Sequence, residues 1–192
     1  MSSTGRRGFY LLRDEAVEKA LNLPSGKYEI PLIIQDRMCN IDGSLSYLNS
    51  AVQPATDYHP MWAPEFFGNF ILVNGMAWPN LDVEPRKYRF RIVNGSDARM
   101  YNLRLVDQRT GKIWPSVYQI GSDGGYLAMP VKLDQTPVGP DEAHDHSSKL
   151  FLAPAERTDV VIDFSGVPEG AKFVFTNDAN SPFPGGDLPD QR

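Results

Sequence analysis

Short runs of alternating or wholly apolar residues, most of them closed by glycine or proline, constrain the fold of this chain more than any other feature. The sequence has 16 glycines and 16 prolines in 192 residues, and most of them fall between these runs. Such a pattern predicts short strands joined by turns, because alternation places every second side chain on one face of a sheet. We count about eight to eleven strands, a number typical of a Greek-key β-sandwich. The sequence therefore predicts an all-β domain.

Two segments predict which side chains face the core. RKYRFRI (86–92) and TDVVIDF (158–164) alternate cleanly, so each strand has one apolar and one largely charged face. We expect Lys87, Arg89, Arg91, Asp159 and Asp163 to face water. Together with positions from MYNLRLVD (100–107), the predicted core residues are Tyr88, Phe90, Ile92, Leu103, Leu105, Val160, Ile162 and Phe164.

The local signals outside the strands predict one short helix and two tight turns. Asp14 is a suitable N-cap for a helix in DEAVEKAL (14–21), which Pro24 and Gly26 would keep short. The turns lie at 40–43, NIDG, and at 123–125, DGG, where glycine and aspartate tolerate the required backbone angles.

The sequence shows no arrangement of residues that predicts catalysis. Asp159 and Asp163 would be about 13 Å apart along a strand, whereas the carboxylate pairs of glycosidases are separated by about 5 to 9.5 Å. There is no GxSxG sequence for a nucleophile elbow. The phosphate-binding patterns GxGxxG and GxxxxGK[ST] are also missing.

Composition excludes several classes of partner. The formal net charge is −5, which argues against a nucleic-acid backbone or an anionic membrane as the main partner. No run of about 18 apolar residues is present, so the sequence predicts no membrane span. The N-terminal segment has no apolar stretch typical of a signal peptide, and one cysteine excludes an internal disulfide. The cellular compartment stays open.

His144 and His146 form a His-Asp-His sequence that deserves a test as a metal site. Side chains two apart on a strand share a face, so both imidazoles could approach one ion. Copper and zinc sites need three or four ligands, and the remaining candidates, His59 and Cys39, are distant in sequence. The flanking residues are typical of a solvated loop. We therefore predict no physiological metal in this chain and only adventitious binding at the pair.

Four long segments, in fixed order, resemble the middle cupredoxin-like domain of three-domain bacterial multicopper oxidases, the group of spore-coat laccase, bilirubin oxidase and phenoxazinone synthase. The segments are YEIPLIIQDRMCNIDGSL, FFGNFILVNGMAWPNLDVEPRKYRFRIVNGSDARMYNL, IGSDGGYL and LFLAPAERTDVVIDF. The resemblance runs from about Gly8 to Gly186. It implies a cupredoxin-like Greek-key β-sandwich over residues 28–178. Residues 1–27 would be the end of a preceding domain and a crossover, and residues 179–192 a linker toward a third domain.

The resemblance also implies a function without a copper site. In this family, a type 1 copper takes electrons from phenols, aromatic amines or tetrapyrroles and passes them to a three-copper cluster that reduces dioxygen to water. The copper ligands lie in the first and third domains, and the middle domain holds these two partners in register. His144 and His146 have the tripeptide of a ligand motif in a different context, so no ligand role transfers to them. The chain alone is expected to be inactive.

Two further expectations concern surfaces. The resemblance places six residues at the rim of the parent enzyme's substrate cleft, although a flexible linker is the alternative for this segment. Separation from its neighbours should expose apolar surface, and FFGNFILV and the residues around Trp62, Trp78 and Trp114 are the candidates, with the core as the alternative for each. Such surface should favour self-association, with edge pairing through GFYLL. The six residues that the resemblance places at the cleft rim are Asn177, Ser181, Pro182, Phe183, Gly185 and Gly186.

The alternative function for this chain is a stand-alone β-sandwich binding or interaction module without redox activity.

Overall fold

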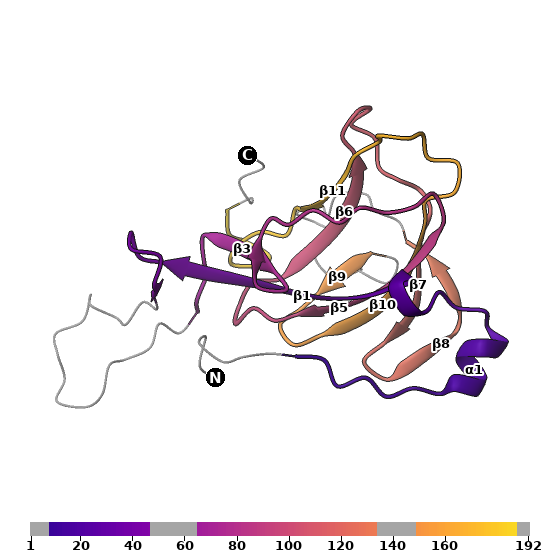
Figure 1. Ribbon diagram of the computed structural model, residues 1–192. Helices are drawn as coiled ribbons and strands as arrows, with labels where there is room; N and C mark the ends of the chain where they lie inside the picture. Colours follow the sequence, from indigo (N-terminus) through magenta and orange to yellow (C-terminus); the bar gives the residue numbers. More distant parts are fainter. Residues whose placement is uncertain (1–7, 47–64, 134–148, 188–192) are drawn as a thin grey trace, which may run out of the picture.

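The computed structural model describes residues 8–46, 65–133 and 149–187 (Figure 1). Within these ranges the chain is almost entirely β, which confirms the predicted fold class. Its helical elements are α1 (Glu15–Ala20) and the 3-10 turn η1 (Gly26–Tyr28). The strands are β1 (Glu29–Cys39), β2 (Leu45–Ser46), β3 (Phe70–Val73), β4 (Met76–Ala77), β5 (Lys87–Asn94), β6 (Tyr101–Asp107), β7 (Val117–Ser122), β8 (Gly125–Lys132), β9 (Leu150–Leu152), β10 (Arg157–Asp163) and β11 (Phe173–Asn177).

The strands form two sheets. The larger sheet has the order β4-β3-β1-β5-β10-β7-β8, with β2 paired to the end of β1, and the smaller has the order β11-β6-β9. β1 and β5 run parallel, whereas the other neighbours in both sheets are antiparallel. β5 therefore lies between two strands that are far from each other in sequence.

The core lies between the two sheets. All eight predicted core residues are buried, and each has at most 4% of its surface exposed. The same cluster joins Val117 of the large sheet to Tyr101, Leu150 and Leu152 of the small sheet. Period-two alternation thus predicted the inward face of β5, β6 and β10 correctly, because it depends only on local strand geometry.

The outer face of β5 does not match the prediction. Lys87 is exposed as expected, but the Arg89 side chain is 1% exposed and the Arg91 side chain 16%. Arg89 donates hydrogen bonds to Asp159 on the neighbouring strand β10, at 3.0 Å from Nε and 2.5 Å from Nη2. Asp159 is therefore an ion-pair partner, and its placement on a solvated face was wrong. Alternation identifies the face of a strand but not what covers it.

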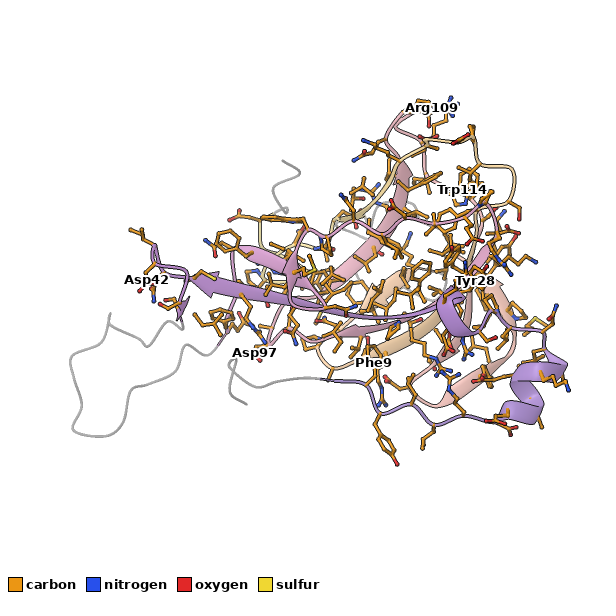
Figure 2. The ribbon with its side chains drawn as sticks, viewed as in Figure 1. Phe9, Tyr28, Asp42, Asp97, Arg109 and Trp114 are labelled. Atoms are coloured by element: carbon orange, nitrogen blue, oxygen red, sulfur yellow. The ribbon has the colours of Figure 1, made fainter. Side chains whose placement is uncertain are left out.

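The predicted helix and turns are present. The Asp14 side chain accepts a hydrogen bond from the Val17 backbone N–H at 3.0 Å and caps α1. Gly43 has a positive φ of 81° in the β1–β2 turn, and Gly125, the first residue of β8, has a φ of 116°. Figure 2 shows Asp42 at the far end of the β1–β2 turn, away from the packed side chains.

The GFYLL segment forms no edge strand, and Trp114 packs against the core. Residues 8–12 form no strand, although Tyr10 and Leu12 are 90% and 77% exposed. Trp114, for which surface and core were both open, packs edge-on against Phe173 and donates its indole N–H to the Asp163 carbonyl at 2.9 Å. An apolar run does not form a strand unless another strand pairs with it, and residues 8–12 have no such partner in the described part of the chain. The indole N–H of Trp114 has a hydrogen-bond acceptor, so the ring can be covered by other side chains.

Of the other candidates for an apolar surface, Phe66 is covered and Trp78 is exposed. Phe66 is buried, at 3% exposed, whereas Trp78 is 64% exposed and its ring lies 6.0 Å from that of Phe70. Trp62 lies outside the described residues. Self-association through such surfaces stays a prediction.

We predict that Arg89→Gln lowers the free energy of unfolding by about 3–5 kcal/mol, because it removes one partner of a buried ion pair and leaves Asp159 without its main cation. Lys87→Gln on the same strand is the control, because Lys87 is exposed and 4.0 Å from Asp163. Its effect should stay below about 1 kcal/mol. Urea denaturation of both variants measures the difference, and equal losses would contradict a stabilising role for the buried pair.

Candidate functional site

The C-terminal segment that follows β11 forms a closed turn on the sandwich. Ser181 and Asp187 exchange two backbone hydrogen bonds, from the Ser181 N–H at 2.9 Å and from the Asp187 N–H at 3.2 Å. The Gly186 N–H donates to the Pro182 carbonyl at 2.6 Å. We call residues 181–187 the C-terminal turn. These backbone hydrogen bonds close the segment on itself.

Gly186 is required by the close approach of the two arms of this turn. A Cβ atom added at Gly186 would lie 2.2 Å from the Ser181 carbonyl carbon and 2.3 Å from the Pro182 nitrogen. Such contacts are too short for any side chain. At Gly185, by contrast, an added Cβ meets nothing within 4 Å. The Gly-Gly pair thus contains one structural glycine and one exposed position.

The remaining predicted rim residues divide into anchors and exposed positions. The Asn177 side chain accepts hydrogen bonds from the Asn102 N–H at 2.8 Å and the Ala179 N–H at 3.1 Å. Phe183 is half-buried, and its ring centroid is 5.0 Å from that of Phe151 in β9. Pro182 is exposed. The structure therefore brings five of the six predicted residues into one turn and places Asn177 at the end of β11, where it directs the chain toward that turn.

Arg99, which sequence reasoning missed, connects the C-terminal turn to the sandwich. Its guanidinium donates to the Ser181 Oγ at 2.8 Å, the Gly68 carbonyl at 2.8 Å and the Asp36 carboxylate at 3.1 Å. The Asp36 side chain is fully buried, and that of Arg99 is 13% exposed. The four residues come from distant parts of the chain, so no local pattern could have signalled this cluster.

A second charged cluster, which we call the crossover cluster, attaches the segment from Arg13 to Glu29 to the outer face of the large sheet. Helix α1 has no buried residues, so apolar packing does not hold it. Glu18 of α1 instead pairs with Arg89 at 3.2 Å and Arg91 at 3.0 Å. Arg13 pairs with Glu18 at 3.1 Å and Glu29 at 2.8 Å, and Arg91 reaches Glu29 at 2.6 Å. This crossover cluster explains why Arg89 and Arg91 are shielded from water.

The ionisation of the crossover cluster follows from its charges. Burial raises the pKa of Glu18, but hydrogen bonds from Tyr126 and Arg89 outweigh it, so the pKa lies below the ordinary value of 4.5. Burial opposes the charge on Arg89, but the hydrogen bond and attraction of Asp159 outweigh it, so its pKa lies above that of a free arginine. Both groups are therefore stabilised in their charged forms.

The described residues do not fit a copper site. No group of three or more His, Cys, Asp or Glu side chains within residues 8–46, 65–133 and 149–187 is arranged to hold a metal ion. Cys39 is a free, half-buried thiol at the end of β1. His59, His144 and His146 lie outside the described residues, so the expected absence of a physiological metal at the His-Asp-His sequence stays a prediction.

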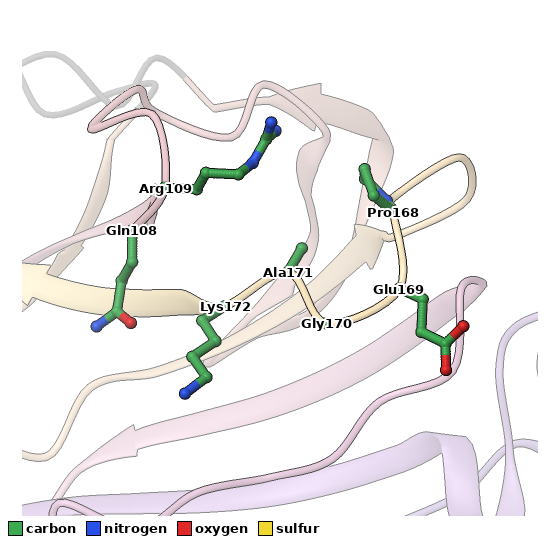
Figure 3. Close-up of a pocket in the computed structure, with 7 residues that line it drawn as sticks. All are labelled: Gln108, Arg109, Pro168, Glu169, Gly170, Ala171 and Lys172. Atoms are coloured by element: carbon green, nitrogen blue, oxygen red, sulfur yellow. The ribbon is translucent and has the colours of Figure 1, made fainter.

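A shallow cavity of about 410 Å³ lies between the residues that follow β6 and those that precede β11 (Figure 3). Its lining includes Arg109, Glu169 and Lys172, whose charged ends point in different directions in Figure 3. Without convergent polar groups, the cavity has no feature that would orient a ligand.

No helix in the described part of the chain is long and apolar enough to cross a membrane.

Comparison with solved structures defines the class of protein. A variant of the McoA multicopper oxidase from Aquifex aeolicus superimposes with a TM-score of 0.62 and 33% sequence identity, over 84% of this chain and 30% of the enzyme. Together with the two packed sheets, this similarity identifies a cupredoxin-like β-sandwich. No model of a known protein family matches the sequence.

The curated relatives are laccases and multicopper oxidases. Laccase from Bacillus stratosphericus is 44% identical over 178 residues, which cover 91% of this chain and 31% of that enzyme. Laccase from Bacillus subtilis is 43% identical over 185 residues, covering 96% of this chain and 31% of the enzyme. The chain thus spans just under a third of these relatives, and its homologues are longer proteins with further domains.

We predict that the crossover cluster contributes to stability in a pH-dependent way. The pKa of Glu18 is lowered by folding, so its contribution is complete above about pH 5 and is lost as the pH falls through the lowered folded-state pKa. The difference in unfolding free energy between wild type and Glu18→Gln should therefore shrink as the pH falls from about 5 to about 3. Denaturant titrations at several pH values measure it.

Glu15→Gln provides the matched control, because Glu15 lies in the same helix and is exposed. Its effect should be small at every pH in this range. A Glu18→Gln difference that stayed constant down to pH 3 would show that the carboxylate of Glu18 is not coupled to folding.

Proposed function

We propose that this chain is the middle domain of a three-domain multicopper oxidase and serves as its copper-free scaffold. The observation that carries the proposal is the 43–44% identity to two laccases over nearly the whole chain, which accounts for only 31% of each of those enzymes. The parent activity would be laccase-like oxidation of phenols, aromatic amines or tetrapyrroles, coupled to reduction of dioxygen to water. Copper would be bound by the first and third cupredoxin domains, the partners of this one.

The two charged clusters support a scaffold role. The crossover cluster fixes the segment that precedes the sandwich, and Arg99 fixes the segment that follows it. A middle domain must hold both of these connections in a defined direction, because the neighbouring domains extend from them. Directional, charge-assisted hydrogen bonds define orientation better than apolar contact alone. We therefore propose residues 1–27 as the incoming crossover, residues 28–178 as the domain and residues 179–192 as the outgoing connection.

We predict that the isolated chain binds no stoichiometric copper and shows no blue absorption, because a type 1 site needs a cysteine thiolate beside two histidines. Replacing the matching segment of Bacillus subtilis laccase with this chain should nevertheless give a blue, active chimera. Copper analysis, visible spectroscopy and turnover of a phenolic dye test both statements. Reinserting the laccase's own segment at the same junctions controls for the junctions.

Two results would contradict this proposal. The first is about one tightly held copper ion per isolated chain that is lost in His144→Ala. The second is a chimera that folds, as judged by circular dichroism, but takes up no copper while its control does. The second result would favour the alternative of a stand-alone binding module.

We further propose that Asn177, Ser181, Pro182, Phe183, Gly185 and Gly186 border the substrate cleft of the parent enzyme. The exposure of Pro182 and Gly185 and the half-buried ring of Phe183 support this assignment, because they offer an apolar edge on a closed turn. Substrate contacts at a rim would affect bulky substrates more than small ones.

We predict that Phe183→Ala and Pro182→Gly in the chimera change the Michaelis constants unequally for a bulky and a small phenol, without altering the copper spectrum. The control is Val174→Ala, because Val174 lies on β11 and is 36% exposed but is outside the turn. If the rim variants and the control give the same constants for both substrates, the segment is only a tether.

A further inference from the structure

Arg99 contacts more segments of the chain than an arginine in a simple ion pair does. It lies in the connection between β5 and β6, and its three acceptors are 63, 31 and 82 residues away in sequence. These acceptors belong to strand β1, to the segment before β3 and to the C-terminal turn. One guanidinium thus joins three separate segments of the chain at one point.

Two of these three contacts form a rigid base. The Asp36 Oδ2 accepts hydrogen bonds from the Gly68 N–H at 2.7 Å and from Arg99 at 3.1 Å, and the Arg99 Nη2 donates to the Gly68 carbonyl. A Cβ added at Gly68 would lie 2.5 Å from the backbone of Arg37, so the Gly68 segment lies directly on β1. This packing leaves Arg99 little freedom to move.

Buried Asp36 needs Arg99 for charge compensation. The carboxylate is fully buried, and its Oδ1 has no hydrogen-bond partner within the described residues. A buried carboxylate of this kind is costly without a cation nearby. Arg99 reaches Asp36, Ser181 and Gly68 from three different nitrogens, whereas the three donors of lysine lie on one nitrogen and cannot match this spacing.

The third contact, from Arg99 to Ser181, connects the C-terminal turn to this base. The backbone hydrogen bonds of the turn close on the turn itself, between Ser181 and Asp187 and between Pro182 and Gly186. The Arg99 Nη1 to Ser181 Oγ bond instead connects the turn to the base. Ser181 directly precedes Pro182 and Phe183, so its position constrains these two side chains, together with the contact between the Phe183 and Phe151 rings.

We propose that Arg99 is a positioning residue that fixes the C-terminal turn and thereby sets which substrates pass the cleft rim of the parent oxidase. The second half of this statement rests on the proposed function of the turn. The first half concerns this chain alone and is tested without copper. Arg99 contacts no reacting group in this scheme and acts through Ser181.

Amide hydrogen exchange in the 192-residue chain tests the positioning. Arg99→Gln and Ser181→Ala should speed exchange at the Ser181, Gly186 and Asp187 amides by about tenfold or more, because a charge-assisted hydrogen bond is lost. Ser181→Ala leaves the Arg99–Asp36 pair intact, so it remains informative if Arg99→Gln fails to fold. Unchanged exchange in Ser181→Ala would overturn the proposal.

Two further variants separate positioning from general stability. Arg91→Gln is the matched control, because the Arg91 side chain is 16% exposed and pairs with two carboxylates in the crossover cluster, away from the turn. It should leave exchange in the turn unchanged. Arg99→Lys keeps the charge beside Asp36, so it should fold yet still loosen the turn. Protection equal to wild type in Arg99→Lys would reduce the role of Arg99 to charge compensation and overturn the proposal.

Kinetics in the laccase chimera test the effect on specificity. Arg99→Lys and Ser181→Ala should change the ratio of Michaelis constants for bulky and small phenols in the same direction as Phe183→Ala, with the copper spectrum unchanged. If Phe183→Ala changes the ratio and the other two variants do not, the inference about Arg99 fails while the rim function stands. If exchange is faster but none of the three variants changes the ratio, the rim function is what fails.

Discussion

The arrangement of the outer face of the large sheet depends on the buried charge of Arg89. A guanidinium that is 1% exposed must have carboxylate partners, because an unpaired charge in the protein interior is strongly destabilising. Asp159 supplies one from β10 and Glu18 another from α1. The pairing across β5 and β10 therefore also fixes the N-terminal crossover, which has no buried residues in its helix to do so.

The same physical device recurs at the other end of the domain. Arg99, paired with Asp36, holds the C-terminal turn, as Arg89, paired with Asp159, holds helix α1 through Glu18. In each case a half-buried or buried arginine serves several acceptors at once, and its delocalised, planar donors suit this geometry. The apolar core between the sheets defines the sandwich itself. The two arginine clusters define how the chain enters and leaves it.

This division of roles bears on the proposed function. In the proposed function, a middle domain without copper ligands would influence the oxidase only through the positions of its neighbours and through its share of the cleft surface. Both depend on the geometry of its two connections. Gly186 illustrates the demand for precision, because an added Cβ would collide with the Ser181 carbonyl carbon at 2.2 Å. The exposed Gly185 beside it tolerates a side chain without such a collision. Within the C-terminal turn, Gly186 is thus held in close backbone packing, whereas Gly185 lies at the surface.

Local signals in the sequence determined the all-β class, the N-cap at Asp14, the tight turns and the inward register of Tyr88, Phe90 and Ile92. Each of these depends on residues within a few positions of one another. The family resemblance supplied the cupredoxin-like fold and the rim candidates. Only the tertiary structure decided that Arg89 and Asp159, 70 residues apart, form a buried pair, and that Arg99 joins Asp36 to Ser181. The physical reason is that strand periodicity specifies which face a side chain occupies, whereas the element that covers that face comes from elsewhere in the chain.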